Sequence, residues 1–210
     1  MSRAPHQSKT RFLDAALLVI RAKGYEAATI DDICVQAKLT KGSFFHHFGG
    51  KQDLALAAAR HFADGADTLF ANAPYRALKD PLARLLGYVD FRKAILRGAL
   101  PEFTCLLGTM VQETYQTHPA IREACDAHIR EHAAVLEADI IEAKSQCAPN
   151  AEWSAQSLAL YTQAVIQGAF ILAKAQYGAR VAADCLDHLR RYLELLFRHA
   201  EPDEETSCVS

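Results

Sequence analysis

The stretch that decides the fold runs from Thr29 to Lys51 and reads TIDDICVQAKLTKGSFFHHFGGK. Thr29 is a favourable helix N-cap, and two aspartates follow in the first turn, where negative charge interacts well with the helix dipole. Ile30, Ile33 and Ala37 then recur at the spacing of one helix face. These features predict a short helix that ends at a tight turn.

A second short helix follows that turn, with Thr40 as its N-cap and lysine, serine, aromatic and histidine side chains along it. Two helices joined in this way form a helix-turn-helix, whose second helix enters the DNA major groove. The small residues Gly42 and Ser43 let the backbone approach DNA closely. The residues predicted to contact DNA are Thr29, Lys38, Thr40, Lys41, Gly42, Ser43, Phe45, His46 and Lys51. The alternative is a helix pair formed by packing alone, as in many all-α proteins.

The distribution of charge favours the DNA-binding interpretation. Up to residue 51 there are eight basic and four acidic side chains, a net charge of +4, whereas the whole chain carries −2, which leaves −6 for the remainder. Phosphate contacts dominate DNA binding, so a locally basic region suffices even when the whole chain is nearly neutral.

The composition indicates a soluble, cytoplasmic protein of 210 residues, with 50% hydrophobic residues available for a core. We find no uncharged, wholly apolar run of membrane-spanning length and no signal peptide, and we expect no membrane partner. Six cysteines are scattered without a C-x-x-C pair, which predicts neither a zinc site nor a disulfide framework. We expect no cofactor and no metal.

The remaining chain has the period of α-helices throughout and no strand-like alternation, so the expected fold class is all-α. A helix is expected from Leu100-Pro101 to Thr117, and another after His118-Pro119. The expected domains are a helix-turn-helix DNA-binding domain over residues 1–51, a helical effector-binding and dimerisation domain over 52–200, and a disordered acidic tail over 201–210.

The run from Thr29 to Leu54, preceded by a helix that ends in Lys-Gly-Tyr, resembles the N-terminal DNA-binding domain of TetR-family transcriptional regulators. The resemblance covers residues 8 to 55 and rests on the pattern K-G-S-x-[aromatic]-x-H-F. Cys34 replaces a common alanine, and Lys38 stands where glycine is usual, at a cost of about 1 kcal/mol if φ is positive. Phe45 replaces a common tyrosine and lacks the hydroxyl that usually reaches the DNA backbone.

The resemblance implies a homodimer in which the last two long helices pair with their copies in a four-helix bundle. Small residues facing branched ones permit close helix approach. The predicted dimer residues are Ala164, Gly168, Ile171 and Ala175 on the penultimate helix and Leu186, Leu189, Leu193 and Leu196 on the last. The alternative is that these positions form an intramolecular core.

The resemblance also implies an effector cavity in the C-terminal region. Its predicted residues are Phe103, Cys105, Thr109 and Met110, together with Gln163, Gln167, Phe170 and Lys174 along one helix face. In the competing interpretation Gln167 and Lys174 are exposed while Phe103 and Met110 are core.

Cys105 lies at the start of a predicted helix, where a thiolate is favoured, and we hypothesise that Lys174 lies beside it. An electrophile or oxidant sensor would result, in line with sensors among the similar TetR-type repressors. The commoner alternative is an apolar cysteine without a sensing role, in a pocket for a reversible ligand.

One catalytic pattern competes with the regulator. The sequence His128-Ile-Arg-Glu131-His132 matches the inverted zinc-protease signature, with two histidines on one helix face. A catalytic zinc needs a third protein ligand, which no part of the sequence identifies. We therefore predict a non-enzymatic regulator, most simply a repressor that binds a palindromic DNA operator and is released by a small-molecule effector, with a zinc-dependent hydrolase as the alternative.

Overall fold

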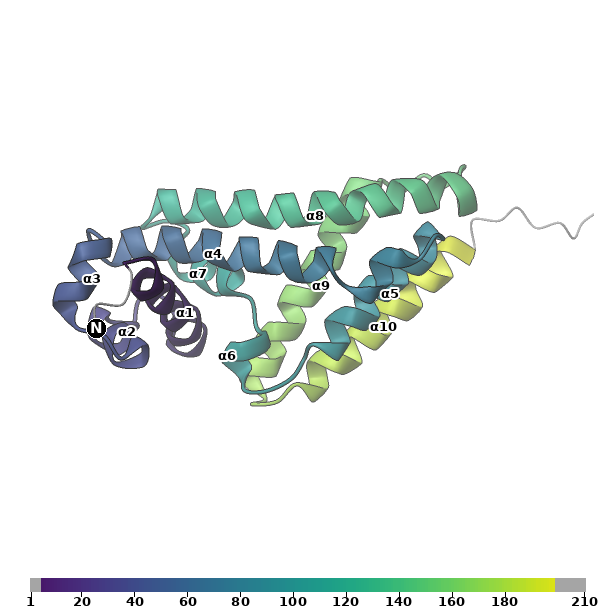
Figure 1. The fold of residues 1–210 in the computed structure, drawn as a ribbon. Coiled ribbons are helices and arrows are strands. Elements are labelled where there is room, and N and C mark those ends of the chain that lie inside the picture. The colour runs from purple at the N-terminus through teal and green to yellow at the C-terminus, as the bar shows by residue number, and fades with distance from the viewer. Residues whose placement is uncertain (1–4, 199–210) are drawn as a thin grey trace, which may run out of the picture. The chain divides into compact units, whose positions relative to one another are not determined.

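The computed structural model describes residues 5–198. Their secondary structure consists of α-helices and one 3₁₀ turn joined by short connections, without β-strands. The helices are α1 (Pro5–Lys23), α2 (Ile30–Ala37), α3 (Lys41–His47), α4 (Lys51–Ala71), η1 (Pro74–Ala77), α5 (Pro81–Ala94), α6 (Leu100–Phe103), α7 (Leu106–Thr114), α8 (Pro119–Cys147), α9 (Ala155–Ala175) and α10 (Arg180–Arg198) (Figure 1). The all-α prediction is confirmed. The predicted disordered tail, 201–210, lies outside the described residues.

Contacts group the chain into two compact units that interleave in sequence. The head unit comprises residues 1–72 and 97–131, and the body unit comprises 73–96 and 132–210. Helix α8 contributes its first part to the head unit and its second part to the body unit. This grouping differs from the domain boundary predicted at residue 51, because α4, α6 and α7 belong with the helix-turn-helix.

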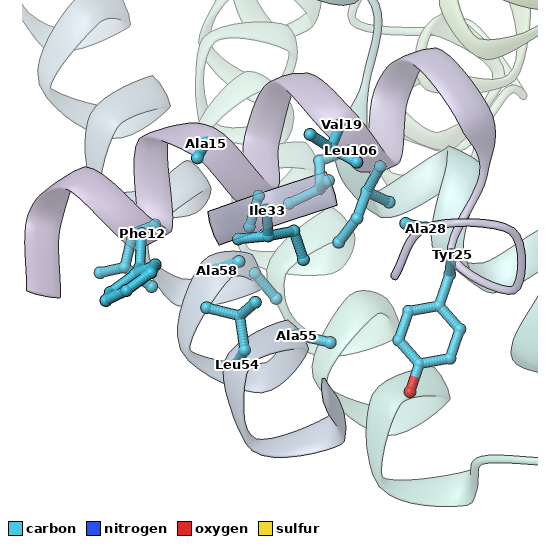
Figure 2. Close-up of a cluster of buried hydrophobic side chains, with 14 of the residues drawn as sticks. Phe12, Ala15, Val19, Tyr25, Ala28, Ile33, Leu54, Ala55, Ala58 and Leu106 are labelled. Atoms are coloured by element: carbon cyan, nitrogen blue, oxygen red, sulfur yellow. The ribbon is translucent and has the colours of Figure 1, made fainter. Parts of the chain in front are cut away.

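The head unit has an apolar core to which α1, α2, α4 and α7 all contribute (Figure 2). Phe12, Ile33 and Leu54 are fully buried in it, and Leu106 joins them from a segment far along the chain. Burying such side chains contributes roughly 1.5 to 3 kcal/mol each. The core therefore fixes α7 against the helix-turn-helix.

The predicted single helix from residue 100 to 117 is wrong, because the chain breaks at Thr104 and forms the separate helices α6 and α7. Arg21 of α1 supplies the physical reason: its buried Nη1 donates to the carbonyls of Glu102 and Thr104, at 3.3 and 3.1 Å. A helix break frees carbonyl groups, and a buried carbonyl needs a donor. An interaction across eighty residues thus decides this local structure.

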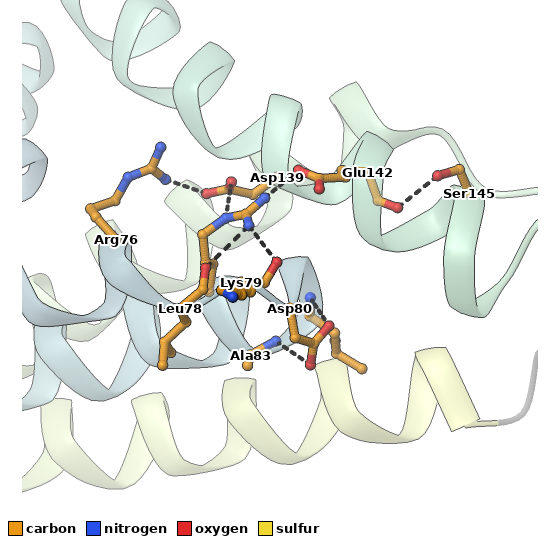
Figure 3. A network of polar contacts seen from close by, with 10 residues as sticks. Arg76, Leu78, Lys79, Asp80, Ala83, Asp139, Glu142 and Ser145 are labelled. Atoms are coloured by element: carbon orange, nitrogen blue, oxygen red, sulfur yellow. Dashed lines mark hydrogen bonds and ion pairs between the residues drawn. The ribbon is translucent and has the colours of Figure 1, made fainter.

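In the body unit, α10 packs against both α9 and α5, and η1 packs against α5. A network of ion pairs joins η1 and α5 to α8 (Figure 3). The buried carboxylate of Asp139 accepts from Arg76 at 2.5 Å and from Arg84 at 2.9 Å, and Arg84 also pairs with Glu142. Asp139 is thereby compensated by two cations, as a buried charge requires.

The long apolar helix α9 qualifies the expectation that no segment suits a membrane. Among the described residues, α9 is the one helix whose length and composition would allow it to cross a bilayer. An 18-residue window within it has a mean hydropathy of 1.3. Its window contains glutamine, serine and threonine, which is why it does not read as a wholly apolar run. One face of the helix, including Leu158, Ile166 and Ala173, is buried within the protein.

Candidate nucleic-acid interface and effector residues

The helix α3 is anchored through one face and presents the other to solvent. Phe44 is fully buried and meets Phe12 and Phe48 at ring-centroid distances of 5.6 and 5.4 Å. The neighbouring Phe45 is 57% exposed, and the side chain of Lys41 is 60% exposed. Because Phe44 fixes the rotation of the helix, Lys41, Phe45 and His46 project outward together.

The two N-caps predicted from the sequence are both present. The Thr29 hydroxyl oxygen accepts the N–H of Asp32 at 3.1 Å, and the Asp32 carboxylate accepts the Thr29 N–H in return, which completes a capping box. Thr40 likewise accepts the N–H of Ser43 at 3.2 Å. Both hydroxyl groups therefore stabilise helix starts, and their additional contact with DNA stays a prediction.

Lys38 adopts the left-handed conformation expected of a residue that occupies a glycine position. Its φ is 53° and its ψ is 46°, and its N–H donates to the carbonyls at the end of α2. Arg11 of α1 donates to the carbonyls of Ala37 and Lys38 and so holds the turn in place. The Lys38 side chain remains exposed at the turn.

The other basic side chains of the head unit interact within the protein. Lys41 pairs with Asp31 at 2.7 Å, and Lys23 pairs with Asp32 at 2.7 Å. The hydrogen bonds from Lys23 and Thr29 lower the pKa of Asp32 to about 2, and the bond to Asp31 raises the pKa of Lys41. Lys51 donates to the carbonyl of Glu26 at 3.0 Å. These exposed pairs are weak, so a phosphate can compete for the lysines.

The predicted dimer residues divide into two groups. Ala164, Ile171 and Ala175 are exposed on α9, and a side chain added at Gly168 would meet open space. Leu186, Leu189 and Leu193 are instead buried, because this face of the amphipathic α10 packs inside the body unit against α9 and α5. Their assignment to the dimer interface is therefore wrong, whereas Leu196 is half-buried.

The exposed apolar residues of α10 lie on its opposite face. Tyr192 and Leu195 are exposed, and the ring of Tyr192 lies 5.2 Å from that of Tyr161 on α9. We call this surface the α9–α10 apolar face. It consists of Tyr161, Ala164, Gly168, Ile171, Leu172, Ala175, Tyr192 and Leu195. An exposed apolar patch of this kind is typical of an interaction surface. The sequence predicted its α9 members Ala164, Gly168, Ile171 and Ala175, but on α10 the leucine stripe pointed to the opposite, buried face.

The predicted effector residues in the head unit have different surroundings. Met110 is fully buried in the apolar core of the head unit, and its assignment to an effector cavity stays a prediction. Phe103, Cys105 and Thr109 are half-buried. Cys105 is the N-cap of α7, and its Sγ accepts the N–H of Gly108 at 3.5 Å. Cys105 also lies near Arg21. Burial lowers the pKa of Arg21 overall, and the charges of Cys105 and Glu102 oppose this shift in part.

The predicted effector residues in the body unit lie along α9. Gln163 and Phe170 are buried, and Gln167 and Lys174 are half-buried. Gln163 Nε2 donates to the Tyr88 hydroxyl at 3.1 Å. Arg92, four residues along α5, donates to the same hydroxyl at 3.0 Å, so Gln163 belongs to a polar group that the sequence prediction did not include. The proximity of Cys105 to Lys174 stays a prediction, since the two residues belong to different units.

The zinc-protease alternative is not supported. His128 Nδ1 pairs with Glu131 at 2.9 Å, whereas His132 Nε2 accepts from Tyr88 and Arg92 at 3.1 and 3.0 Å. Burial, assisted by the Arg92 charge, lowers the pKa of His132 to about 3. Within residues 5–198, no group of three His, Cys, Asp or Glu side chains is arranged to hold a metal ion.

Two family models match the sequence. Residues 12–58 match bacterial regulatory proteins of the TetR family, and residues 81–184 match the C-terminal domain of LmrA/YxaF-like transcriptional regulators. Both matches lie on the elements described above: the first covers the helix-turn-helix, and the second spans α5 through α9 and the start of α10.

The chain is also similar to individual proteins. It is 35% identical over 118 residues to the transcriptional regulator AcuR of Cereibacter sphaeroides, covering 51% of this chain and about half, 48%, of AcuR. It is 25% identical over 173 residues to LmrA, an HTH-type transcriptional regulator of Bacillus subtilis, covering 79% of this chain and 85% of LmrA. A TetR transcriptional regulator from Chloroflexus aurantiacus superposes with a TM-score of 0.80 at 25% identity, over 92% of this chain and 97% of that one. The chain belongs to the TetR family of bacterial regulatory proteins.

Proposed function

We propose that the protein is a DNA-binding transcriptional repressor that binds a palindromic operator as a homodimer in the cytoplasm and is released by a small-molecule effector. The observation that carries the proposal is the orientation of α3, which buries Phe44 and exposes Lys41, Phe45 and His46. A recognition helix needs this arrangement, because its outward side chains must reach base edges while its inner face is fixed by the core. Phe45 supplies an apolar contact in place of a hydroxyl.

The α9–α10 apolar face supports the homodimer part of the proposal. A two-fold dimer places the same patch of both subunits in contact, and the small residues Ala164 and Gly168 would allow the helices to approach closely. The two recognition helices could then occupy successive major grooves, about 34 Å apart. An effector that favours a body shape with a different spacing would release the DNA. The proposed effector residues remain Phe103, Cys105, Thr109, Met110, Gln163, Gln167, Phe170 and Lys174.

Gel-shift titration with the DNA that flanks the protein's own gene tests the proposal. We expect Lys41→Ala and Phe45→Ala each to weaken operator binding without loss of helicity. Lys51→Ala should weaken binding to operator and scrambled DNA alike and reduce the slope of log K against log salt by about 1. Asp31→Asn is the matched control: it breaks the same ion pair as Lys41→Ala but retains the lysine, so binding should be equal or tighter. Unchanged affinity in all three loss variants would refute the recognition-helix assignment.

A further inference from the structure

The turn that follows α1 is held by a residue that lies almost ninety positions further along the chain. The backbone N–H of Glu26 donates to the Glu113 carboxylate at 2.8 Å. Gly24 adopts a φ of 90°, and a Cβ atom at this position would overlap the same carboxylate, so the glycine makes room for Glu113. Glu113 lies in the last turn of α7, and both segments belong to the head unit. The carboxylate therefore ties α7 to residues 24–26, which we call the α1–α2 turn.

The corner between α7 and α8 contacts the α1–α2 turn a second time. Tyr25 projects from this turn and is only 2% exposed (Figure 2). Its ring lies 5.2 Å from the ring of His118, the residue that precedes α8. His118 Nδ1 also lies 3.8 Å from the Glu26 carboxylate. Residues of this corner therefore hold both the backbone and the side chains of the turn.

The α1–α2 turn holds Lys51, the first residue of α4. Lys51 Nζ donates to the carbonyl of Glu26 at 3.0 Å and lies 4.4 Å from the centroid of the Tyr25 ring. An ammonium has three N–H donors, so two remain after the bond to the carbonyl. Neutral groups thus hold this ammonium, whereas Lys23 and Lys41 pair with aspartate carboxylates. Lys51 is therefore ordered and retains donors for a phosphate.

Glu113 occupies an unfavourable position in two respects. A helix C-terminus disfavours negative charge, and the last turn of α7, which the structure describes in full, has no basic residue to compensate. A carboxylate also repels the phosphates of DNA, which the head unit is proposed to bind. Because sequences depart from local preferences mainly at functional sites, the contact with the α1–α2 turn accounts for an acid at this position.

We propose that Glu113 is a positioning residue for DNA binding that acts through Lys51. This inference rests on the proposed function, in which Lys51 contacts a phosphate. The Glu113 carboxylate holds the N–H of Glu26, the carbonyl of Glu26 holds the ammonium of Lys51, and this ordered ammonium donates to the phosphate. A side chain that is ordered before binding loses less conformational entropy when the complex forms. The acid therefore increases DNA affinity despite its charge.

Gel-shift titration of the full chain with operator and scrambled DNA tests the proposal. Glu113→Ala removes the acceptor, and we expect affinity for both duplexes to fall by about two- to tenfold, because a phosphate contact carries no sequence information. Glu113→Gln loses the charge but keeps an oxygen that can accept the Glu26 N–H, so it should bind as tightly as wild type or tighter. Electrostatic repulsion alone predicts instead that both variants bind more tightly than wild type.

The control variant is Glu123→Ala, which removes one negative charge from the same unit. Glu123 is exposed and pairs with Arg122 on its own helix, so its removal should not weaken binding. Circular dichroism and thermal denaturation check that every variant is folded. Equal affinity of Glu113→Ala and Glu113→Gln would overturn the proposal.

A double-mutant cycle with Lys51→Ala separates positioning from a general effect on the head unit. If Glu113 acts through Lys51, then Glu113→Ala should cause no further loss of affinity in the Lys51→Ala background. An undiminished loss in that background would show that Glu113 acts by another route and would refute the inference.

The same titrations distinguish failure of this inference from failure of the proposed function. If the flanking DNA is bound no better than scrambled DNA, the repressor function is contradicted, while the effect of Glu113→Ala is still measured on the scrambled duplex. If Lys51→Ala weakens binding and Glu113→Ala does not, only this inference is contradicted. Binding that is unchanged in Lys51→Ala removes the phosphate contact and this inference with it.

Discussion

At the scale of single residues, His132 links the polar interior of the body unit to the pH dependence of stability. Burial lowers its pKa to about 3 in the folded protein, below the ordinary value of 6.5. Between these values the unfolded chain binds a proton that the folded chain does not, so the free energy of unfolding falls as pH falls. The contribution of neutral His132 to the free energy of unfolding is complete above pH 6.5. Below that pH it falls by at most about 1.4 kcal/mol per pH unit.

We therefore expect His132→Gln to flatten the dependence of unfolding free energy on pH between 4.5 and 6.5. Urea denaturation at several pH values measures it. The lowered pKa of Asp32, about 2, affects stability only below its ordinary value of 3.8 and does not interfere. His46→Gln, on the exposed surface of α3, serves as the control and should retain the wild-type slope. Equal slopes for wild type and His132→Gln would contradict the assignment.

At the scale of secondary-structure elements, the end of α2 carries a measurable strain. Lys38 holds a φ of 53°, where a side chain costs about 1 kcal/mol relative to glycine. Lys38→Gly should raise the free energy of unfolding by roughly 0.5 to 1 kcal/mol. Lys38→Ala loses the same charge but keeps the strain, so it should not stabilise. Both variants should lose the proposed phosphate contact and lower the salt slope of DNA binding by about 1. Equal stability of the two variants would argue against strain.

The elements also show where sequence reasoning succeeds and where it fails. The caps at Thr29 and Thr40 and the left-handed turn at Lys38 were predictable, because neighbouring residues determine them. The break between α6 and α7 was not, because Arg21 lies eighty residues away. The α10 leucines were recognised as an apolar stripe, but periodicity does not say whether α9 and α5 or a second chain covers that stripe. The hydrogen bonds among Tyr88 and Arg92 of α5, His132 of α8 and Gln163 of α9 could not be predicted either, because they join residues from three separate helices.

At the scale of the whole molecule, Gly168 tests whether the α9–α10 apolar face joins two chains. Its Cα faces open space within the monomer, so Gly168→Leu should not strain the fold. In a dimer whose helices cross there, leucine overpacks the contact, and light scattering should show a shift towards monomer with weaker operator binding. Gly65→Leu is the matched control, since Gly65 also lies in a helix and faces open space. A wild-type chain that stays monomeric at every concentration would refute the dimer.

The bonds from Arg21 to the carbonyls of Glu102 and Thr104 also bear on how such a regulator can diverge. A recombination that joined residues 1–51 to a foreign C-terminal region would leave a buried guanidinium without its acceptors and the core without Leu106. We therefore expect a chimera that joins only residues 1–51 to a foreign C-terminal region to be less stable than one that also keeps residues 52–72 and 97–131, which belong to the same unit. Point substitutions on the exposed face of α3, the proposed recognition helix, would change operator specificity without removing these contacts.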